Sequence, residues 1–178
     1  MNQEPETYIV AQTRFLNLVK RRSWVFVQRP KQIGVVAIAA ITDDRKMILI
    51  TQYRPPTNSI VIELPAGLAG DIAGQEDESL QTAAQRELLE ETGYCAANWK
   101  QLATVASSAG MTDERVTMFL ATSLVKTGAG GGDESEDITV HEVLLDEIQS
   151  WIDEKVKTGA NVSARVYAAL HFVRANQC

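Results

Sequence analysis

The sequence predicts a mixed α/β (α+β) fold in which a mixed β-sheet lies between helices and follows an N-terminal β extension. Three observations lead to this prediction: consecutive apolar, β-branched-rich runs, one helical pattern after them, and two more helical patterns near the end of the chain. The length of 178 residues is typical of a single domain. We expect residues 1–32 to form the extension and residues 33–178 to form the main domain.

The first thirty residues alternate between apolar and polar side chains, which is typical of extended strands. One apolar group runs from Phe15 to Val19, and a second runs from Trp24 to Val27. We therefore expect two strands, joined as a hairpin around residues 20–23. Pro30 ends this section, because proline has no N–H to donate to a sheet.

The segment IGVVAIAAI, residues 33–41, is apolar at every position except its glycine. A run of this length and composition is typical of a strand that is buried on both faces. A turn at residues 42–46 and two further strands should follow, at residues 47–54 and 59–64. Prolines interrupt the chain after each of these strands.

A helix should follow at residues 79–92, with Asp77, Glu78 or Ser79 as its N-cap and Gly93 as its C-terminal stop. The elements expected after it are strands at 99–107 and 114–125, an acidic glycine-rich loop at 128–137, a last strand at 138–145, and helices at 145–156 and 162–173.

The helix at residues 79–92 carries carboxylates where its buried face should continue. Leu80 and Ala84 mark the apolar side, and Glu87 and Glu91 extend the same line, with Glu90 beside them. Side chains at this spacing have Cβ atoms only about 5–6 Å apart, so three anions need cations between them. Mg²⁺ or Mn²⁺ would satisfy these oxygen ligands.

Arg86 lies next to these glutamates in sequence and could orient a carboxylate through a bidentate bond. The projection alone leaves a second interpretation open, because glutamate-rich helices are commonly solvated and stabilised by weak i, i+4 pairs.

Composition limits the classes of partner. The net charge of −6 argues against nucleic acid or an anionic membrane as the main partner, but not against a phosphorylated substrate, since bound cations invert the local charge. The two cysteines, Cys95 and Cys178, favour a reducing compartment. The first residues lack a signal-peptide pattern, and no apolar run approaches the ~20 residues of a membrane span. We expect a cytoplasmic protein.

The segment ESLQTAAQRELLEETGY, residues 78–94, resembles the box of the Nudix hydrolase family. The matched positions are Glu78, Arg86, Glu87, Leu88, Glu90, Glu91, Gly93 and Tyr94. The first half of the box departs from the family pattern, because Ile72 stands where the family has glycine. Gly67 lies eleven positions before Glu78, which indicates a five-residue insertion in the loop before the helix.

Three further segments are similar to the ADP-ribose pyrophosphatase branch of this family. They are QYRPP (residues 52–56), ELPAG (residues 63–67) and the late acidic loop. A fourth segment, SSAGMTDE (residues 107–114), has Ala109 where the branch has proline.

The resemblance implies a Nudix fold and Mg²⁺-dependent hydrolysis of ADP-ribose to AMP and ribose 5-phosphate by a metal-activated water, with Mn²⁺ as a substitute ion. The implied metal ligands are Glu87, Glu90, Glu91 and the carbonyl of Ala66, with Glu78 as a less direct member. The implied catalytic residues are Arg86, Glu87, Glu91 and a general base, for which Glu134 and Glu136 stay open. The implied substrate-binding residues are Arg54 for a phosphate or ribose, Glu63 for a hydroxyl or amine, and Gly110.

The resemblance also implies a small-molecule nucleoside diphosphate substrate and a homodimer formed through the N-terminal strands. Trp24 or Phe26 would stack on an adenine if those strands reach a site. Two alternatives stay open: a hydrolase of another nucleoside diphosphate derivative, such as a nucleotide sugar or NADH, and a Nudix-like nucleotide sensor without turnover.

Overall fold

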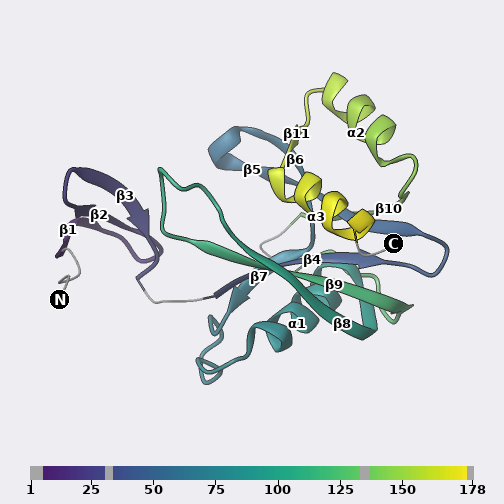
Figure 1. The fold of residues 1–178 in the computed structure, drawn as a ribbon, viewed down its shortest axis with the longest axis horizontal. Helices are drawn as coiled ribbons and strands as arrows, with labels where there is room; N and C mark the ends of the chain where they lie inside the picture. The colour runs from purple at the N-terminus through teal and green to yellow at the C-terminus, as the bar shows by residue number, and fades with distance from the viewer. Residues whose placement is uncertain (1–5, 31–33, 133–136, 176–178) are drawn as a thin grey trace.

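A computed structural model of the chain describes residues 6–30, 34–132 and 137–175. The centre of the molecule is an eight-stranded mixed sheet (Figure 1). Its strands are β4 (Gly34–Ile41), β5 (Lys46–Arg54), β6 (Ser59–Glu63), β7 (Ala66–Ala69), β8 (Tyr94–Ala106), β9 (Arg115–Lys126), β10 (Thr139–Leu144) and β11 (Asn161–Val162). A 3₁₀ turn, Pro55–Thr57, joins β5 to β6.

Helices cover both faces of this sheet, which confirms the predicted layered α/β fold (Figure 1). Helix α1 (Leu80–Thr92) packs on one face through Ala83, Ala84 and Leu88. Helices α2 (Ile148–Lys157) and α3 (Ala164–Ala175) pack on the other face. The described residues contain no helix long and apolar enough to cross a membrane.

Strand β4 contributes to both cores, as its continuous apolar sequence predicts. Val36, Ile38 and Ala40 face α1, whereas the residues between them face α2 and α3. Every residue from Val35 to Ile41 is at most 7% exposed. A strand enclosed on both faces loses the apolar–polar alternation of a half-exposed strand, because both sets of side chains leave water.

Strand β4 also changes its antiparallel partner along its length, and this change creates the opening for the site. Gly34–Ala37 pair with β7, whereas Ala40 and Ile41 pair with β5. Between these segments the N–H of Ile38 donates to the carbonyl of Pro65 at 2.8 Å. Strands β5 and β7 therefore diverge where the chain passes from β6 into β7.

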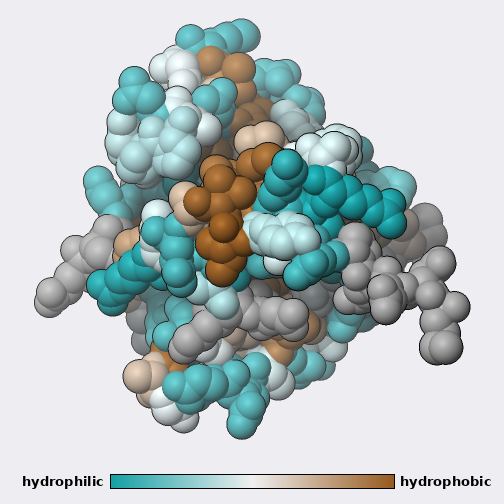
Figure 2. Space-filling model, turned by 90° about the vertical axis from the view of Figure 1, so that its left-hand side faces the viewer, coloured by the Kyte–Doolittle hydropathy of each residue, from teal (hydrophilic) through white to brown (hydrophobic). Residues whose placement is uncertain are grey.

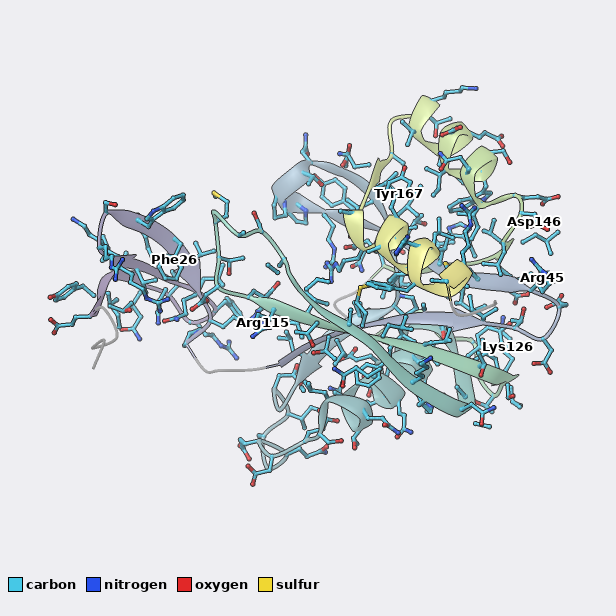
Figure 3. All side chains as sticks on the ribbon, viewed as in Figure 1. Phe26, Arg45, Arg115, Lys126, Asp146 and Tyr167 are labelled. Carbon is cyan, nitrogen blue, oxygen red and sulfur yellow. The ribbon has the colours of Figure 1, made fainter. Side chains whose placement is uncertain are left out.

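Three N-terminal strands form a separate antiparallel sheet: β1 (Thr7–Gln12), β2 (Asn17–Arg21) and β3 (Trp24–Gln28). The hairpin expected at residues 20–23 is confirmed by the pairing of β2 with β3. Figure 3 shows Phe26 in this sheet, at the opposite end of the molecule from Arg45 and Asp146.

The end of β3 is tied to the loop between β8 and β9 by three bonds. The N–H of Val27 donates to the carbonyl of Met111 at 2.8 Å, the amide of Gln28 bonds Asp113 at 2.5 Å, and Arg29 pairs with Glu114 at 3.0 Å. The division of the chain at residue 32 stays a prediction.

The structure differs from the sequence prediction mainly in short elements. Strands β1, β7 and β11 were not expected, so residues 138–145 do not hold the last strand. Residues 145–147, 162 and 163 lie outside α2 and α3, and Val162 belongs to β11 instead. Strands β7 and β11, with four and two residues, carry too few side chains for a periodic pattern, and their pairing partners decide their conformation.

Candidate active site

Helix α1 begins after Ser79, one of the three N-cap candidates in the sequence, and ends at Gly93 as predicted. The hydroxyl of Ser79 accepts from the N–H of Thr82 at 3.1 Å, which satisfies one of the unpaired donors of the first turn. Gly93 adopts a left-handed conformation with φ 73°, and its N–H donates to Leu89. Both ends of the helix are therefore fixed, and so is the direction of its glutamates.

The carboxylates of α1 continue its buried face, as the helical projection predicts. Glu87 is 9% exposed and Glu91 is 2% exposed, beside the fully buried Leu88. Burial raises the pKa of Glu87, and the charge and hydrogen bond of Arg86 oppose this effect. Glu91 lies against β7, where its Oε2 accepts from the N–H of Ala66 at 3.0 Å. The interpretation as a solvated helix face is therefore wrong for these two residues.

Arg86 holds the carboxylates together from the side of the helix. Its Nε and Nη2 donate to the two oxygens of Glu78 at 3.1 and 3.2 Å, the bidentate geometry expected from the sequence. Its Nη1 donates to Glu87 at 2.9 Å and to Glu90 at 3.0 Å. The hydrogen bond from Arg86 lowers the pKa of Glu78, so this carboxylate is held ionised.

The inserted loop before α1 closes on the same guanidinium. Arg86 donates to the carbonyl of Leu68 at 2.8 Å and pairs with Asp71 at 3.4 Å. Glu78 accepts from the N–H of Gly70 at 3.2 Å. The start and the end of the loop are therefore bonded to each other, which explains how extra residues fit without displacing α1.

Gly67 occupies the position that the sequence assigned to the displaced box glycine. A Cβ atom at this residue would lie 2.0 Å from the carboxylate carbon of Glu87. The absence of a side chain therefore lets this carboxylate rest against the backbone of β7.

The donor set fits a hard divalent cation, because carboxylate and carbonyl oxygens are the ligands that Mg²⁺ prefers. Glu87, Glu90 and Ala66 line one cavity of about 580 Å³. In the described part of the chain, no three acidic, histidine or cysteine side chains are already close enough to hold a metal ion. Arg86 instead occupies the space between these carboxylates, so metal binding would require them to turn toward the cavity.

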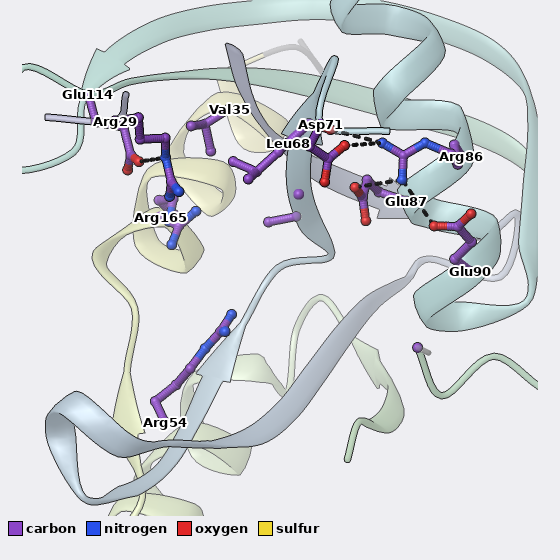
Figure 4. A pocket seen from close by; sticks show the side chains of 13 residues that line it. Arg29, Val35, Arg54, Leu68, Asp71, Arg86, Glu87, Glu90, Glu114 and Arg165 are labelled. Atoms are coloured by element: carbon purple, nitrogen blue, oxygen red, sulfur yellow. Dashed lines mark hydrogen bonds and ion pairs between the residues drawn. The ribbon is translucent and has the colours of Figure 1, made fainter. Parts of the chain in front are cut away.

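The opposite side of this cavity carries three arginines, one of them paired with Glu114 (Figure 4). On the first side, Arg86, Glu87 and Glu90 come from α1, and Asp71 comes from the loop after β7. Arg54 ends β5 and pairs with Glu63 at 2.6 Å. Arg29 follows β3, and Arg165 lies in the first turn of α3. The sequence predicted only Arg54, because nothing in the local pattern of Arg29 or Arg165 distinguishes them from surface arginines.

Comparison with known proteins identifies the architecture. The family model of the NUDIX domain matches residues 30–170. The chain belongs to the Nudix family.

Several relatives share this Nudix sequence. The chain is 37% identical over 123 residues to a methanol dehydrogenase activator of Bacillus methanolicus, covering 68% of this chain and 64% of that protein. It is 35% identical over 126 residues to an ADP-ribose pyrophosphatase of Bacillus subtilis (strain 168), covering 70% and 65%. The matches thus span just under two thirds of these relatives. A solved structure described as an ADP compounds hydrolase superimposes with a TM-score of 0.73 at 26% identity, covering 97% of this chain and 94% of that one.

Four predicted residues of the Nudix site do not line the main cavity. Glu78 and Glu91 lie behind its wall, bonded to Arg86 and Ala66, and Gly110 and Glu63 are the other two. Gly110 lines a separate cavity of about 320 Å³ between the N-terminal sheet and the β8–β9 loop, together with Trp24 and Phe26. Glu63 is 6% exposed and lies behind Arg54 rather than on the cavity wall. The roles of Gly110 and Glu63 in substrate binding stay predictions. Glu134 and Glu136 lie outside the described residues.

The glycine-rich segment that precedes residues 133–136 docks on the end of the Nudix helix. The N–H groups of Gly131 and Gly132 donate to the carbonyls of Glu91 and Glu90 at 2.8 and 3.1 Å. These bonds satisfy acceptors that the last turn of a helix leaves unpaired. The described part of the loop, through Gly132, is thus a cap on the helix that carries the carboxylates.

Proposed function

We propose that this Nudix protein is an Mg²⁺-dependent diphosphatase that hydrolyses ADP-ribose to AMP and ribose 5-phosphate. The observation that supports this most is the cavity of about 580 Å³, which has Glu87 and Glu90 at one end and Arg29, Arg54 and Arg165 at the other. A diphosphate requires both: cations held by carboxylates on one side, and guanidinium groups for its remaining oxygens.

Each residue has a distinct part in this proposal. Glu87, Glu90 and Glu91 would hold the metal with the carbonyl of Ala66, and Arg86 would direct their carboxylates. When bound, the ion neutralises phosphate charge and lowers the pKa of a water molecule. Arg54 would bind a phosphate oxygen, while Glu78 keeps Arg86 in place through its bidentate bond. A general base from the late acidic loop, Glu134 or Glu136, would take the proton of the attacking water.

A second substrate class is favoured by two comparisons. The chain is 34% identical over 147 residues to a uridine diphosphate glucose pyrophosphatase of Mus musculus, and its structural neighbour is named for ADP compounds in general. The five-residue insertion and Ala109 also depart from the ADP-ribose pyrophosphatase pattern. The alternative substrates are therefore a nucleotide sugar or NADH.

A substrate panel tests these proposals. The purified protein is incubated with Mg²⁺ and ADP-ribose, NADH, ADP-glucose, UDP-glucose or GDP-mannose, and the nucleoside monophosphate released is measured. We expect the highest kcat/KM for ADP-ribose. A higher value for another compound would transfer the assignment to that substrate. No turnover of any compound, with binding retained, would favour the non-catalytic sensor instead.

Glu91→Gln is the matched variant for this panel. The glutamine keeps the shape of the side chain and an oxygen for the N–H of Ala66, but it removes the charge. We expect turnover to fall by at least about a hundred-fold, because the metal stabilises the charge of the transition state by several kcal/mol. The circular dichroism spectrum should stay unchanged, since the fold does not depend on this charge. Full activity of Glu91→Gln would contradict the assignment of Glu91 as a metal ligand.

We further propose that two chains associate as a homodimer through the N-terminal sheet. This sheet exposes apolar side chains, among them Ile9 (60%), Val10 (57%) and Val25 (49%). Figure 2 views this end of the molecule, where apolar side chains gather between polar ones. Three short strands with an uncovered apolar surface gain little stability alone. The cytoplasmic location expected from the cysteine content stays a prediction.

A further inference from the structure

Glu63 is a buried carboxylate that lies between two arginines of the cavity wall. Its Oε2 accepts from Nε of Arg54 at 2.6 Å, and its Oε1 lies 3.7 Å from Nη2 of Arg165. The side chain of Glu63 is 8% exposed, compared with 41% for Arg54 and 29% for Arg165. Both arginines line the cavity, whereas Glu63 does not.

Backbone pairing brings these three residues together from distant parts of the sequence. Arg54 pairs with Ser59 across the β5–β6 hairpin, and Glu63 ends β6. Strand β11 runs parallel to β6, and the N–H of Ser163 donates to the carbonyl of Ile62 at 2.9 Å. The first turn of α3 therefore starts beside Glu63, and this start fixes the position of Arg165.

Stability alone does not account for this arrangement. A cation in the first turn of a helix is disfavoured by the helix dipole, and Arg165 is the second residue of α3. A buried ion pair contributes little net stability, because desolvation of the charges offsets their attraction. Two guanidinium groups and one carboxylate also leave one net positive charge on this cluster, at the end of the cavity opposite Glu87 and Glu90. An anionic ligand would neutralise this charge.

We propose that Arg54 and Arg165 form an arginine clamp that binds a phosphate group of the substrate, and that Glu63 is the residue that positions both guanidiniums. This inference rests on the proposed diphosphatase function. It assigns Arg165 to substrate binding, and it replaces the expected contact of Glu63 with a substrate hydroxyl or amine. With Nε held by Glu63, the terminal nitrogens of Arg54 are directed to the cavity, in the fork geometry that suits phosphate oxygens.

Equilibrium binding without metal tests the clamp separately from catalysis. The dissociation constant of ADP-ribose is measured by calorimetry in EDTA for the wild type, Arg165→Ala and Arg174→Ala. Arg174 is the matched control, because it lies in the last turn of the same helix and does not line this cavity. Thermal unfolding of each variant verifies that the chain is folded.

We expect Arg165→Ala to weaken binding about ten-fold to a hundred-fold, the range for a lost charge-assisted hydrogen bond, and Arg174→Ala to leave binding unchanged. Equal affinities of Arg165→Ala and Arg174→Ala would overturn the clamp, and so would a wild type that does not bind ADP-ribose in EDTA.

A pair of ligands identifies which phosphate the clamp binds. ADP-ribose and its 2′-phosphorylated form differ only in one phosphate monoester. If the clamp binds the diphosphate, Arg165→Ala weakens both ligands equally. If the clamp binds an additional phosphate, the wild type prefers the phosphorylated form and Arg165→Ala removes that preference. The first result supports the clamp on the substrate. The second result overturns it, because Arg165→Ala would then leave the binding of ADP-ribose itself unchanged. An Arg165→Ala protein that binds both ligands like the wild type overturns it as well.

A double-mutant cycle tests the positioning role of Glu63. If Glu63 acts through the arginines, Glu63→Gln weakens binding in the wild type but has a smaller effect in the Arg165→Ala background. If Glu63 contacts the substrate itself, the two fold-changes multiply, and the positioning role is wrong.

The outcomes for clamp and catalysis are distinguishable. If the protein hydrolyses ADP-ribose and Arg165→Ala does not change the affinity for it, the proposed function stands and the clamp is wrong. Binding that depends on Arg165, without turnover in Mg²⁺, would leave the clamp intact and remove the hydrolase function.

Discussion

Gly67 lets the carboxylate of Glu87 lie directly against strand β7. The obstruction that a Cβ atom would meet is the end of a flexible side chain, at 2.0 Å, and not backbone. A larger residue can therefore be accommodated by moving Glu87. The fold would tolerate this movement, whereas a metal site that depends on the position of Glu87 would not.

Gly67→Ala should consequently separate activity from stability. We expect kcat/KM for ADP-ribose to fall by about a hundred-fold, since a displacement near 1 Å at a reacting site can cost this much. The free energy of unfolding should change by less than about 1 kcal/mol, because alanine also restricts the unfolded chain. Steady-state kinetics and urea denaturation measure the two quantities. An active Gly67→Ala protein would show that Glu87 need not occupy its observed position.

At the scale of elements, α1 is held in place at its C-terminal end by the glycine-rich loop. Gly130 has φ 70°, and a Cβ atom there would lie 2.4 Å from the carbonyl carbon of Thr92. Backbone thus packs directly on backbone, and only glycine allows this approach. The glycine at position 130 therefore has a structural reason that a merely flexible loop would lack.

Gly130→Ala should destabilise the protein more than the backbone strain of an alanine at positive φ would on its own. Gly74→Ala is the matched control, because Gly74 has φ 83° and no atom within 4 Å of its would-be Cβ. We expect the free energy of unfolding of Gly74→Ala to fall by about 1–2 kcal/mol, because alanine is strained in a left-handed backbone conformation. Gly130→Ala should lower the free energy of unfolding by about 1–3 kcal/mol more than the control does, because the added methyl group overpacks the contact. If the loop instead detaches from α1, amide exchange at Gly131 and Gly132 should become faster. Urea denaturation and hydrogen exchange decide this. Equal behaviour of the two variants would refute the docking role.

Strand β10 meets α2 through His141, whose ring lies 5.0 Å from that of Trp151 and whose Nε2 bonds Thr51 at 2.9 Å. Burial lowers the pKa of His141, and the charge of Lys155 lowers it further. Above about pH 6.5, the ordinary pKa of histidine, the residue is neutral in both folded and unfolded chains. As the pH falls below this value, the unfolded chain binds the proton first, so the folded state loses stability.

We therefore expect wild-type stability to fall more steeply than that of His141→Gln between pH 7 and pH 5. Denaturation at a series of pH values measures the difference between the two proteins, which removes the contribution of the other titrating groups. His171→Gln serves as the control, since His171 is exposed on α3. Parallel curves for wild type and His141→Gln would show that this histidine is not buried as observed.

At the scale of the whole molecule, the N-terminal sheet lies beside the main body rather than within it (Figure 1). Its described bonds to the body come from the end of β3, and they place Arg29 in the main cavity. Any movement or covering of this sheet would therefore affect the site directly. This links the proposed dimer to substrate binding.

Val25→Lys should dissociate the proposed dimer, because Val25 is 49% exposed on β3 and a lysine there would bring like charges together across the interface. We expect light scattering to give twice 19.6 kDa for the wild type and 19.6 kDa for the variant. Val125→Lys is the control, since this exposed strand valine lies on β9, outside the N-terminal sheet. A monomeric wild type, or a dimeric Val25→Lys protein, would contradict this interface.

Much of the fold and half of the cavity could be predicted from local sequence. The C-terminal end of α1 follows from Gly93, and the burial of Glu87 and Glu91 follows from helical spacing. These are short-range properties, because caps and helix faces depend only on residues a few positions apart. Arg165 could not be predicted in the same way, because its role depends on the distant residue Glu63.

The sequence by itself determined the family pattern, the layered fold and the glutamates of the site, since local composition, periodicity and motif spacing encode them. At the basic end the sequence indicated Arg54 alone, and only the tertiary structure brought Arg29 and Arg165 beside it. Arg29, Arg54 and Arg165 come from three elements, and strand pairing and the β3 contacts bring them to one cavity. Contacts between residues far apart in sequence leave no periodic pattern, so the arrangement of these arginines becomes visible only when the chain is folded.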